Sequence, residues 1–211
     1  MNEIESKIEN VLVELRKNSK KRKFDQTIDL IINLQKFDVK KNSMNIIVSL
    51  PHKVKEKKVC GFFEVKSDKV DTVTKSEFAR YSKKNELKKL EKKYDFFIAE
   101  ASLMPAVATS FGRALGPSGK MPSPQLGILS NSDSKLIESV IEKINNSIKI
   151  RTKEPSIKVP IGKESMKDKD VVENIVYVYN NVLKNLPRNK ENIRNIEIKF
   201  TMTKPIKIKF D

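Results

Sequence analysis

The chain has 211 residues and a net charge of +16, so its length permits one or two domains and its charge favours a polyanionic partner over solubility alone. Most of the positive charge comes from lysine, which contacts phosphates as a point charge and lacks the planar fork that reads base edges. One cysteine and one histidine exclude a structural disulfide and a Cys/His zinc cluster, and they argue against cysteine or histidine catalysis.

The amino terminus, MNEIESKIEN, is charged from its third residue and lacks the apolar segment of a signal peptide. No apolar stretch reaches the ~18–20 residues that a membrane-spanning helix needs. We therefore expect a cytoplasmic protein without membrane contact. Apolar residues at helical spacing predict an amphipathic first helix over about 3–17.

The basic run RKNSKKRK, residues 16–23, holds six cations in eight residues and is either a solvated linker or a binding edge. Alternating apolar residues predict strands at Phe24–Leu34 and Met44–Leu50. The short apolar runs Val59–Val65 and Phe96–Ala99 are typical of buried strands, and a lysine-rich helix over 76–93 lies between them. This strand, helix and strand order predicts βαβ units with a parallel sheet.

The second half of the chain predicts a helix over about 133–146, then a hairpin-like alternating stretch over 147–162. A further helix is expected over 165–186, with acidic residues in its first turn. Two alternating strands are expected within 192–210, the first with Ile196, Ile198, Phe200 and Met202 on one face.

Period-two strands at both ends and buried-strand patterns in the middle indicate one domain interrupted by another. We expect an α/β (α+β) protein in which domain I comprises residues 1–56 and 148–211 and domain II comprises residues 57–147. Domain I is expected to hold an antiparallel sheet, and domain II to be a small α/β domain with a parallel sheet.

The segment SFGRALGPSGKMPSP, residues 110–124, gathers glycine and proline in what reads as one loop. The segment does not match the phosphate-binding motif G-x-x-x-x-G-K-[ST], because Ala114 stands in place of the first glycine and Met121 in place of the serine or threonine. We therefore expect a rigid shaped loop, no enzyme and no cofactor or metal. The positive charges of Arg113 and Lys120, on either side of the glycine-rich part of this segment, are suited to binding phosphate. A nucleotide-binding enzyme is the alternative.

The stretch YDFFIAEASLMPAVATSFGRALGPSGKMPSP resembles the L-one family of large-subunit ribosomal proteins, and KFDQTIDLIINL, VSLPH and IEIKFTMTKPIKI resemble three further landmarks in the family's order. The resemblance covers nearly the whole chain. It implies the two-domain fold of that family, in which both chain ends form domain I and a Rossmann-like domain II is inserted between them.

The resemblance implies that domain I binds a stem-loop of large-subunit rRNA in the mobile ribosomal stalk, which helps deacylated tRNA to leave the exit site. The implied partners are this rRNA, exit-site tRNA and other ribosomal proteins, with the chain a monomer within the ribosome. The alternative is a translational repressor that binds its own mRNA through the same surface.

By resemblance, the RNA contacts map onto Lys23, Phe24, Thr27, Thr201, Met202 and Thr203. Nearby cations supply the electrostatic part: Lys20, Lys21, Arg22, Lys199 and Lys204. The domain II loop adds Arg113, Gly116, Pro117, Gly119, Lys120, Met121 and Pro122. Thr203 replaces a family glycine, and Ser118 replaces the usual arginine.

Several of these residues also have plain structural readings. The alternative interpretation places Phe24 and Met202 in the core. For Met202 it follows from the strand alternation, which puts this residue on the same face as Phe200. His52 and Cys60 are expected to be a loop histidine and a buried strand cysteine without a catalytic role.

Overall fold

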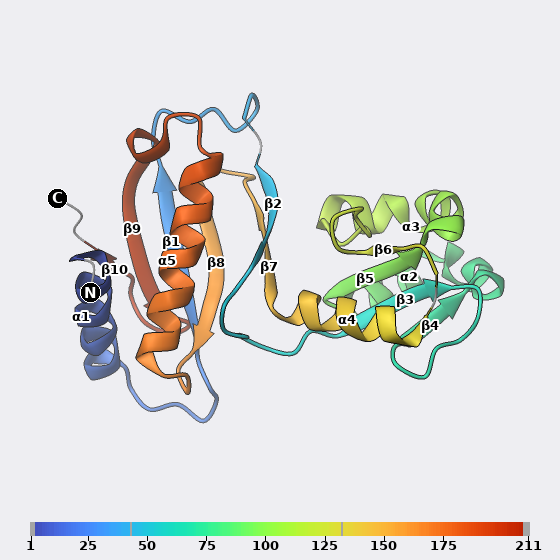
Figure 1. Cartoon of the computed structure of the whole chain (residues 1–211), viewed down its shortest axis with the longest axis horizontal. Helices are drawn as coiled ribbons and strands as arrows, with labels where there is room; N and C mark the ends of the chain where they lie inside the picture. Colours follow the sequence, from blue (N-terminus) through green and yellow to red (C-terminus); the bar gives the residue numbers. More distant parts are fainter. Residues whose placement is uncertain (1–2, 43, 132, 209–211) are drawn as a thin grey trace. The chain divides into compact units, whose positions relative to one another are not determined.

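The computed structural model describes residues 3–42, 44–131 and 133–208, and the chain divides into two compact units (Figure 1). Unit 1 contains both ends of the chain, Met1–Val54 and Asn146–Asp211, and unit 2 is the segment Lys55–Asn145 between them. Within the described ranges, none of the helices has both the length and the apolar character that crossing a membrane requires.

Unit 1 is built on a four-stranded antiparallel sheet with the strand order β10-β9-β1-β8. Its strands are β1 (Thr27–Leu34), β8 (Ser156–Lys163), β9 (Ile193–Phe200) and β10 (Ile206–Ile208). Every second residue of β1 is buried, as its sequence alternation predicts. The predicted closing strands are present, and residues 209–210 of the second lie outside the described residues.

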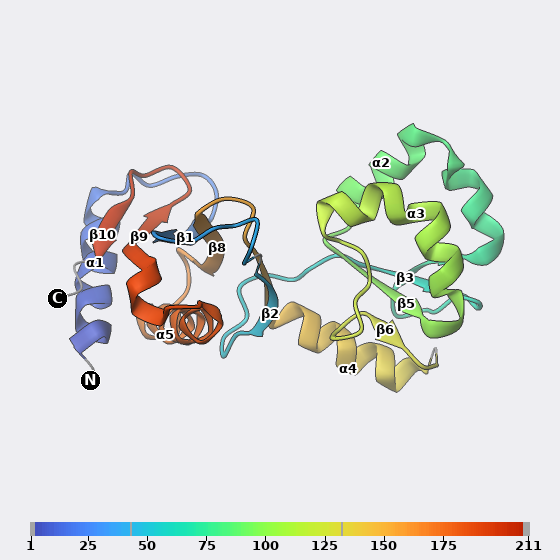
Figure 2. The same cartoon turned by 90° about the horizontal axis from the view of Figure 1, so that it is seen from above.

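Two helices cover the apolar face of this sheet, α1 (Glu3–Asn18) and α5 (Asp168–Asn185) (Figures 1 and 2). Leu12 of α1, Val178 of α5 and Leu30 of β1 are completely buried in one core cluster. Both helices were predicted, the first from its apolar spacing. Each buries a single stripe of residues against the sheet.

The stretch 147–162 is not a hairpin. Its first part forms β7 (Ser147–Arg151), which pairs antiparallel with β2 (Asn45–Ser49), whereas β8 pairs with β1. Thr152 fixes this arrangement, because its hydroxyl accepts the Met44 N–H at 2.8 Å and its own N–H donates to the Met44 carbonyl at 3.0 Å. Alternation identifies a strand but leaves its partner open, so the hairpin prediction was wrong.

Unit 2 contains the predicted parallel sheet, with the strand order β4-β3-β5-β6. Its strands are β3 (Val59–Phe63), β4 (Asp71–Thr74), β5 (Phe96–Glu100) and β6 (Ile128–Leu129). Its helices are η1 (Lys75–Ser82), α2 (Lys84–Lys93), η2 (Ala101–Leu103), α3 (Met104–Ser118) and α4 (Ser134–Asn145). Alternate β3 residues enter two different core clusters, so both faces of the sheet are covered.

Two predictions for unit 2 need correction, and one strand was not predicted. The helix expected over 76–93 is divided into the 3-10 helix η1 and the α-helix α2, with Lys83 in extended conformation between them. The polar strand β4 had no apolar pattern to reveal it. The supposed loop 110–124 is helical up to Ser118, because α3 buries Phe111 and Leu115 at helical spacing despite Pro117 in its last turn.

Asp71 at the start of β4 gives unit 2 a testable acid dependence. The Tyr94 hydroxyl, 2.5 Å away, and the Lys93 ammonium donate to this carboxylate and lower its pKa. A carboxylate whose pKa is lowered by folding stabilises the fold above its unfolded pKa, and this contribution is lost as the pH falls through the folded value. We expect Asp71→Asn to lower stability at pH 7 by about 0.5–1 kcal/mol, since the group is exposed, and to have little effect at pH 2.

Hydrogen exchange of β3 and β5 peptides, measured by mass spectrometry at both pH values, checks this expectation. The matched control is Asp133→Asn, which changes an exposed carboxylate of unit 2 whose side chain has no hydrogen-bond partner in the described structure. If Asp71→Asn lowers the stability of unit 2 equally at pH 2 and pH 7, the effect does not come from the charge of the carboxylate.

Candidate nucleic-acid interface

The residues predicted to contact RNA come together where β1 begins and β9 ends. Because the two strands run antiparallel, Ile28 pairs with Phe200 and the chain turns away just beyond this pair. The Thr27 N–H donates to the Thr201 hydroxyl oxygen at 3.0 Å, and the Thr201 N–H donates to the Thr27 carbonyl at 3.0 Å. The two segments, 174 residues apart in sequence, are therefore locked side by side.

A buried glutamine ties this end of the sheet together, and sequence analysis missed it. Gln26 is only 1% exposed. Its Oε1 accepts the Met202 N–H at 3.3 Å, and its Nε2 donates to the Ser19 hydroxyl at 3.0 Å and to the Glu164 carboxylate at 3.1 Å. The available signal was the period of β1, since residue 26 falls on the buried register of residues 28, 30 and 32.

Two large apolar side chains stand exposed at this end of unit 1. Phe24 is 51% exposed and Met202 is 58% exposed, so the core reading of each is wrong. Met202 leaves the alternation of β9 because the Thr203 hydroxyl accepts the Phe200 N–H at 2.9 Å, which closes a turn directly after the strand. An aromatic ring and a thioether kept in solvent can pack against riboses or bases.

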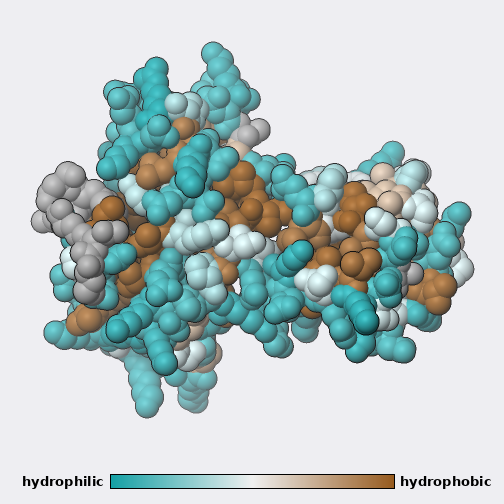
Figure 3. Space-filling model, in the orientation of Figure 1, coloured by the Kyte–Doolittle hydropathy of each residue, from teal (hydrophilic) through white to brown (hydrophobic). Residues whose placement is uncertain are grey.

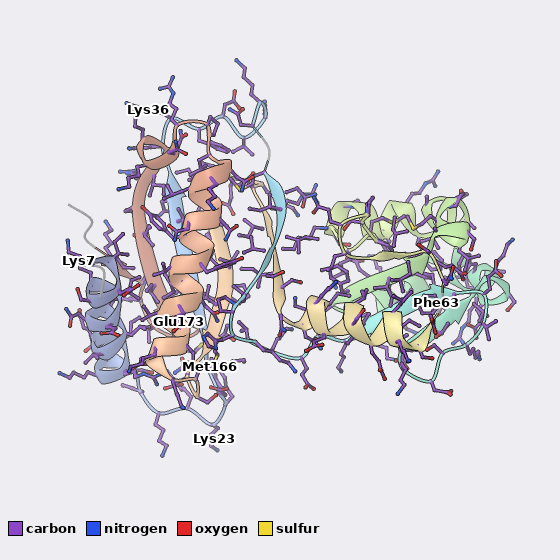
Figure 4. All side chains as sticks on the ribbon, in the orientation of Figure 1. Lys7, Lys23, Lys36, Phe63, Met166 and Glu173 are labelled. Carbon is purple, nitrogen blue, oxygen red and sulfur yellow. The ribbon has the colours of Figure 1, made fainter. Side chains whose placement is uncertain are left out.

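A group of exposed cations surrounds these apolar residues. Lys20, Lys21, Arg22, Lys23 and Lys204 are all exposed, and no ion pair with another described residue engages them. Figure 4 labels Lys23 at this end of unit 1, and hydrophilic residues project from the same end in Figure 3. Solvated cations beside exposed apolar groups are typical of surfaces that bind a phosphate backbone.

Lys199 and Arg16 differ from these solvated cations. Lys199 is half-buried on β9 opposite Asp29, where burial raises the pKa of the aspartate and the lysine charge acts in the opposite direction. Arg16, the first cation of the basic run, donates to the Asp168 carboxylate at 2.7 Å and to the carbonyls of Glu164 and Met166. Arg16 therefore fastens α1 to the start of α5, and the solvated part of the run begins after it.

Comparison with known proteins identifies the family. The profile described as "Ribosomal protein L1p/L10e family" matches residues 15–204. The chain belongs to this L1 family. It is 32% identical to large ribosomal subunit protein uL1 of Pyrococcus horikoshii, over 96% of this chain and 95% of that protein. The uL1 proteins of Nanoarchaeum equitans and Pyrobaculum calidifontis are 33% and 36% identical, over 93% of this chain and 97% and 90% of theirs.

Membership of the L1 family makes the chain a ribosomal protein, which is a structural and non-enzymatic kind of protein. It confirms the resemblance on which the site residues were mapped, and the two-domain α/β fold agrees with it. The role of each mapped residue in RNA binding stays a prediction.

Thr203, the position at which the resemblance implies a family glycine, has no backbone strain. The described non-glycine residues with positive φ are Lys36 and Asn189, so Thr203 is not in the left-handed region that favours glycine. Its hydroxyl also supplies the hydrogen bond that closes the turn after β9. The β-branched side chain therefore contributes to the shape of this turn.

The segment 110–124 of unit 2 makes structural contacts of its own. Gly119 has φ 74° and ends α3 in the left-handed conformation. The Lys120 ammonium donates to the carbonyls of Glu91 and Tyr94 at 2.7 and 2.8 Å, so it caps the end of α2. The Ser118 hydroxyl donates back to the Ala114 carbonyl of α3.

The remaining predicted residues of this segment divide into exposed and packed ones. Arg113, Gly116 and Pro117 lie on the exposed side of α3 and are not in a loop. Met121 packs against the core cluster of Phe62, and Pro122 is buried. The segment thus forms a stiff corner of unit 2.

His52 and Cys60 occupy the structural positions expected of them. His52 Nε2 lies 2.7 Å from the Glu173 carboxylate, and its backbone N–H donates to the buried Asn174 amide oxygen. Cys60 is buried in β3, and burial raises the pKa of its thiol to about 12. A protonated, buried thiol is a poor nucleophile.

Proposed function

We propose that this protein binds large-subunit rRNA through the surface formed by Lys20–Thr27 and Thr201–Lys204, and thereby forms part of the mobile stalk of the large ribosomal subunit. The proposal rests mainly on the exposure of Phe24 and Met202 on a hydrogen-bonded frame, among cations that pair with no carboxylate of the described residues. The names of the uL1 relatives support the assignment to the large subunit.

The chemistry of this surface favours RNA. The cations neutralise phosphates, and Phe24 packs against an unstacked base or a ribose. The hydroxyl oxygens of Thr27 and Thr201 already bond within the protein, and each keeps a lone pair that can accept from the 2′-hydroxyls that distinguish RNA from DNA. Because the frame is fixed by backbone and glutamine hydrogen bonds, little conformational entropy is lost on binding.

The finer role follows from the L1 resemblance. A stalk protein of this kind assists the release of deacylated tRNA from the exit site, with rRNA, exit-site tRNA and neighbouring ribosomal proteins as its partners. Within the ribosome we expect one copy of the chain, acting without a cofactor.

Ultraviolet crosslinking of the purified chain to total RNA tests the proposal. We expect crosslinked peptides from residues 20–27 and 199–204, joined to nucleotides of a single stem-loop region of large-subunit rRNA. Crosslinks confined to unit 2, or spread evenly over all RNA, would overturn it. Additional crosslinks to the chain's own messenger would point to translational repression through the same surface.

A further inference from the structure

A groove of about 450 Å³ opens beside the exposed methionine of unit 1, between the last turn of α1 and the turn that follows β9. This volume lies within the ~300–1,000 Å³ range of sites that hold small organic groups. Gln26 sets its width, because it binds Ser19 on one wall and the Met202 backbone on the other. The groove is therefore preformed.

The walls of the groove combine apolar groups with polar groups that can still form hydrogen bonds. Ile206 supplies apolar surface, Leu15 lies buried beneath it, and Met202 stands at the edge. Asn18 is exposed there, and its amide makes no hydrogen bond to another described residue. The Ser19 hydroxyl accepts from Gln26 and keeps its own proton to donate. An amide and a hydroxyl next to apolar walls match the edge and faces of a nucleobase.

The charges around the groove favour an anionic occupant. Among the described residues that line it, Lys20, Arg22 and Lys204 stand against one carboxylate, that of Glu14. The three cations have no ion-pair partner among the described residues. A cluster of cations around a groove attracts the phosphates on either side of a nucleotide.

We propose that one unpaired nucleotide of the bound RNA inserts its base into this groove. The Asn18 amide hydrogen-bonds the base edge, the Ser19 hydroxyl adds a donor, and the Met202 thioether packs against the ring. This inference rests on the proposed function and adds that the RNA target presents an unstacked base. A paired base does not fit this role, because its Watson–Crick edge is already engaged.

Asn18→Ala tests the base contact. The probe is large-subunit rRNA purified from Pyrococcus horikoshii, and affinity is measured by filter binding. We expect a loss of about tenfold, the range of one good amide-to-base contact. Asn10→Ala, on the exposed side of the same helix, is the matched control and should bind as the unaltered chain does.

A second measurement separates base recognition from general weakening. Crosslinking identifies the nucleotide that contacts residues 18–22, and a synthetic stem-loop is made with that base intact or replaced by an abasic site. The unaltered chain should lose about tenfold on the abasic RNA, and Asn18→Ala less than twofold. Equal losses for both proteins, normal binding by Asn18→Ala, or crosslinks at residues 18–22 only to paired nucleotides or to none would overturn the inference. If the unaltered chain itself fails to bind rRNA, the proposed function fails instead.

Discussion

Lys23→Glu is expected to lower the affinity for large-subunit rRNA by one to two orders of magnitude at about 0.15 M salt. Lys23 is exposed next to Phe24 and has no ion-pair partner among the described residues, so its charge is available to a phosphate. If about six phosphates are neutralised, the logarithm of affinity falls with that of salt concentration with a slope of roughly −4 to −5. Reversing one charge removes one contact and adds a repulsion, so the slope should flatten by about one to two.

The effect of Lys23→Glu should lie mainly in the association rate, because exposed charges steer the encounter. Lys135→Glu is the matched control, since it makes the same change of charge at an exposed lysine of unit 2 that has no ion-pair partner among the described residues. It should leave the slope nearly unchanged. An unaltered slope for Lys23→Glu would exclude Lys23 as a phosphate contact.

The elements that could be predicted from sequence are those with a repeated apolar pattern. The helices α1, α4 and α5 and the strands β1 and β9 each bury one regular face, and that face is visible as spacing in the chain. The pairing of the strands was harder to predict from sequence. The contact that directs β7 to β2 and away from β8 joins Thr152 to Met44, which are 108 positions apart. The polar strand β4 is held by its parallel neighbour β3 and carries no pattern of its own.

The sequence predicted which residues form the candidate site, but it did not predict how their side chains are arranged or which of them are engaged in contacts within the protein. Charge and the L1 resemblance pointed to Lys23, Phe24 and Thr201, and the structure brings their segments together. Composition treats all cations of the run alike, whereas Arg16 is engaged with Asp168 and the next cations are solvated. Such differences depend on contacts across more than 150 residues, which local patterns do not encode.

Gln26→Leu is expected to destabilise unit 1 by about 2–3 kcal/mol and to weaken rRNA binding at least tenfold. Leucine has a similar volume, but it leaves the Met202 N–H and the Ser19 hydroxyl without their partner and brings an apolar group against the Glu164 carboxylate. The turn that carries Met202 then loses its link to the segment that carries the cations. Urea unfolding of unit 1, followed by hydrogen exchange of β1 and β9 peptides, measures the first effect, and filter binding measures the second.

The kinetics of Gln26→Leu should differ from those of Lys23→Glu. Gln26 is buried and its substitution leaves the net charge at +16, so the encounter with RNA and the salt slope should persist while dissociation becomes faster. Gln125→Leu, the same change at an exposed site of unit 2, is the control and should alter neither quantity. If Gln26→Leu lowers stability but leaves the dissociation rate unchanged, the cationic segment and the turn act independently, and the rigid frame is not part of RNA recognition.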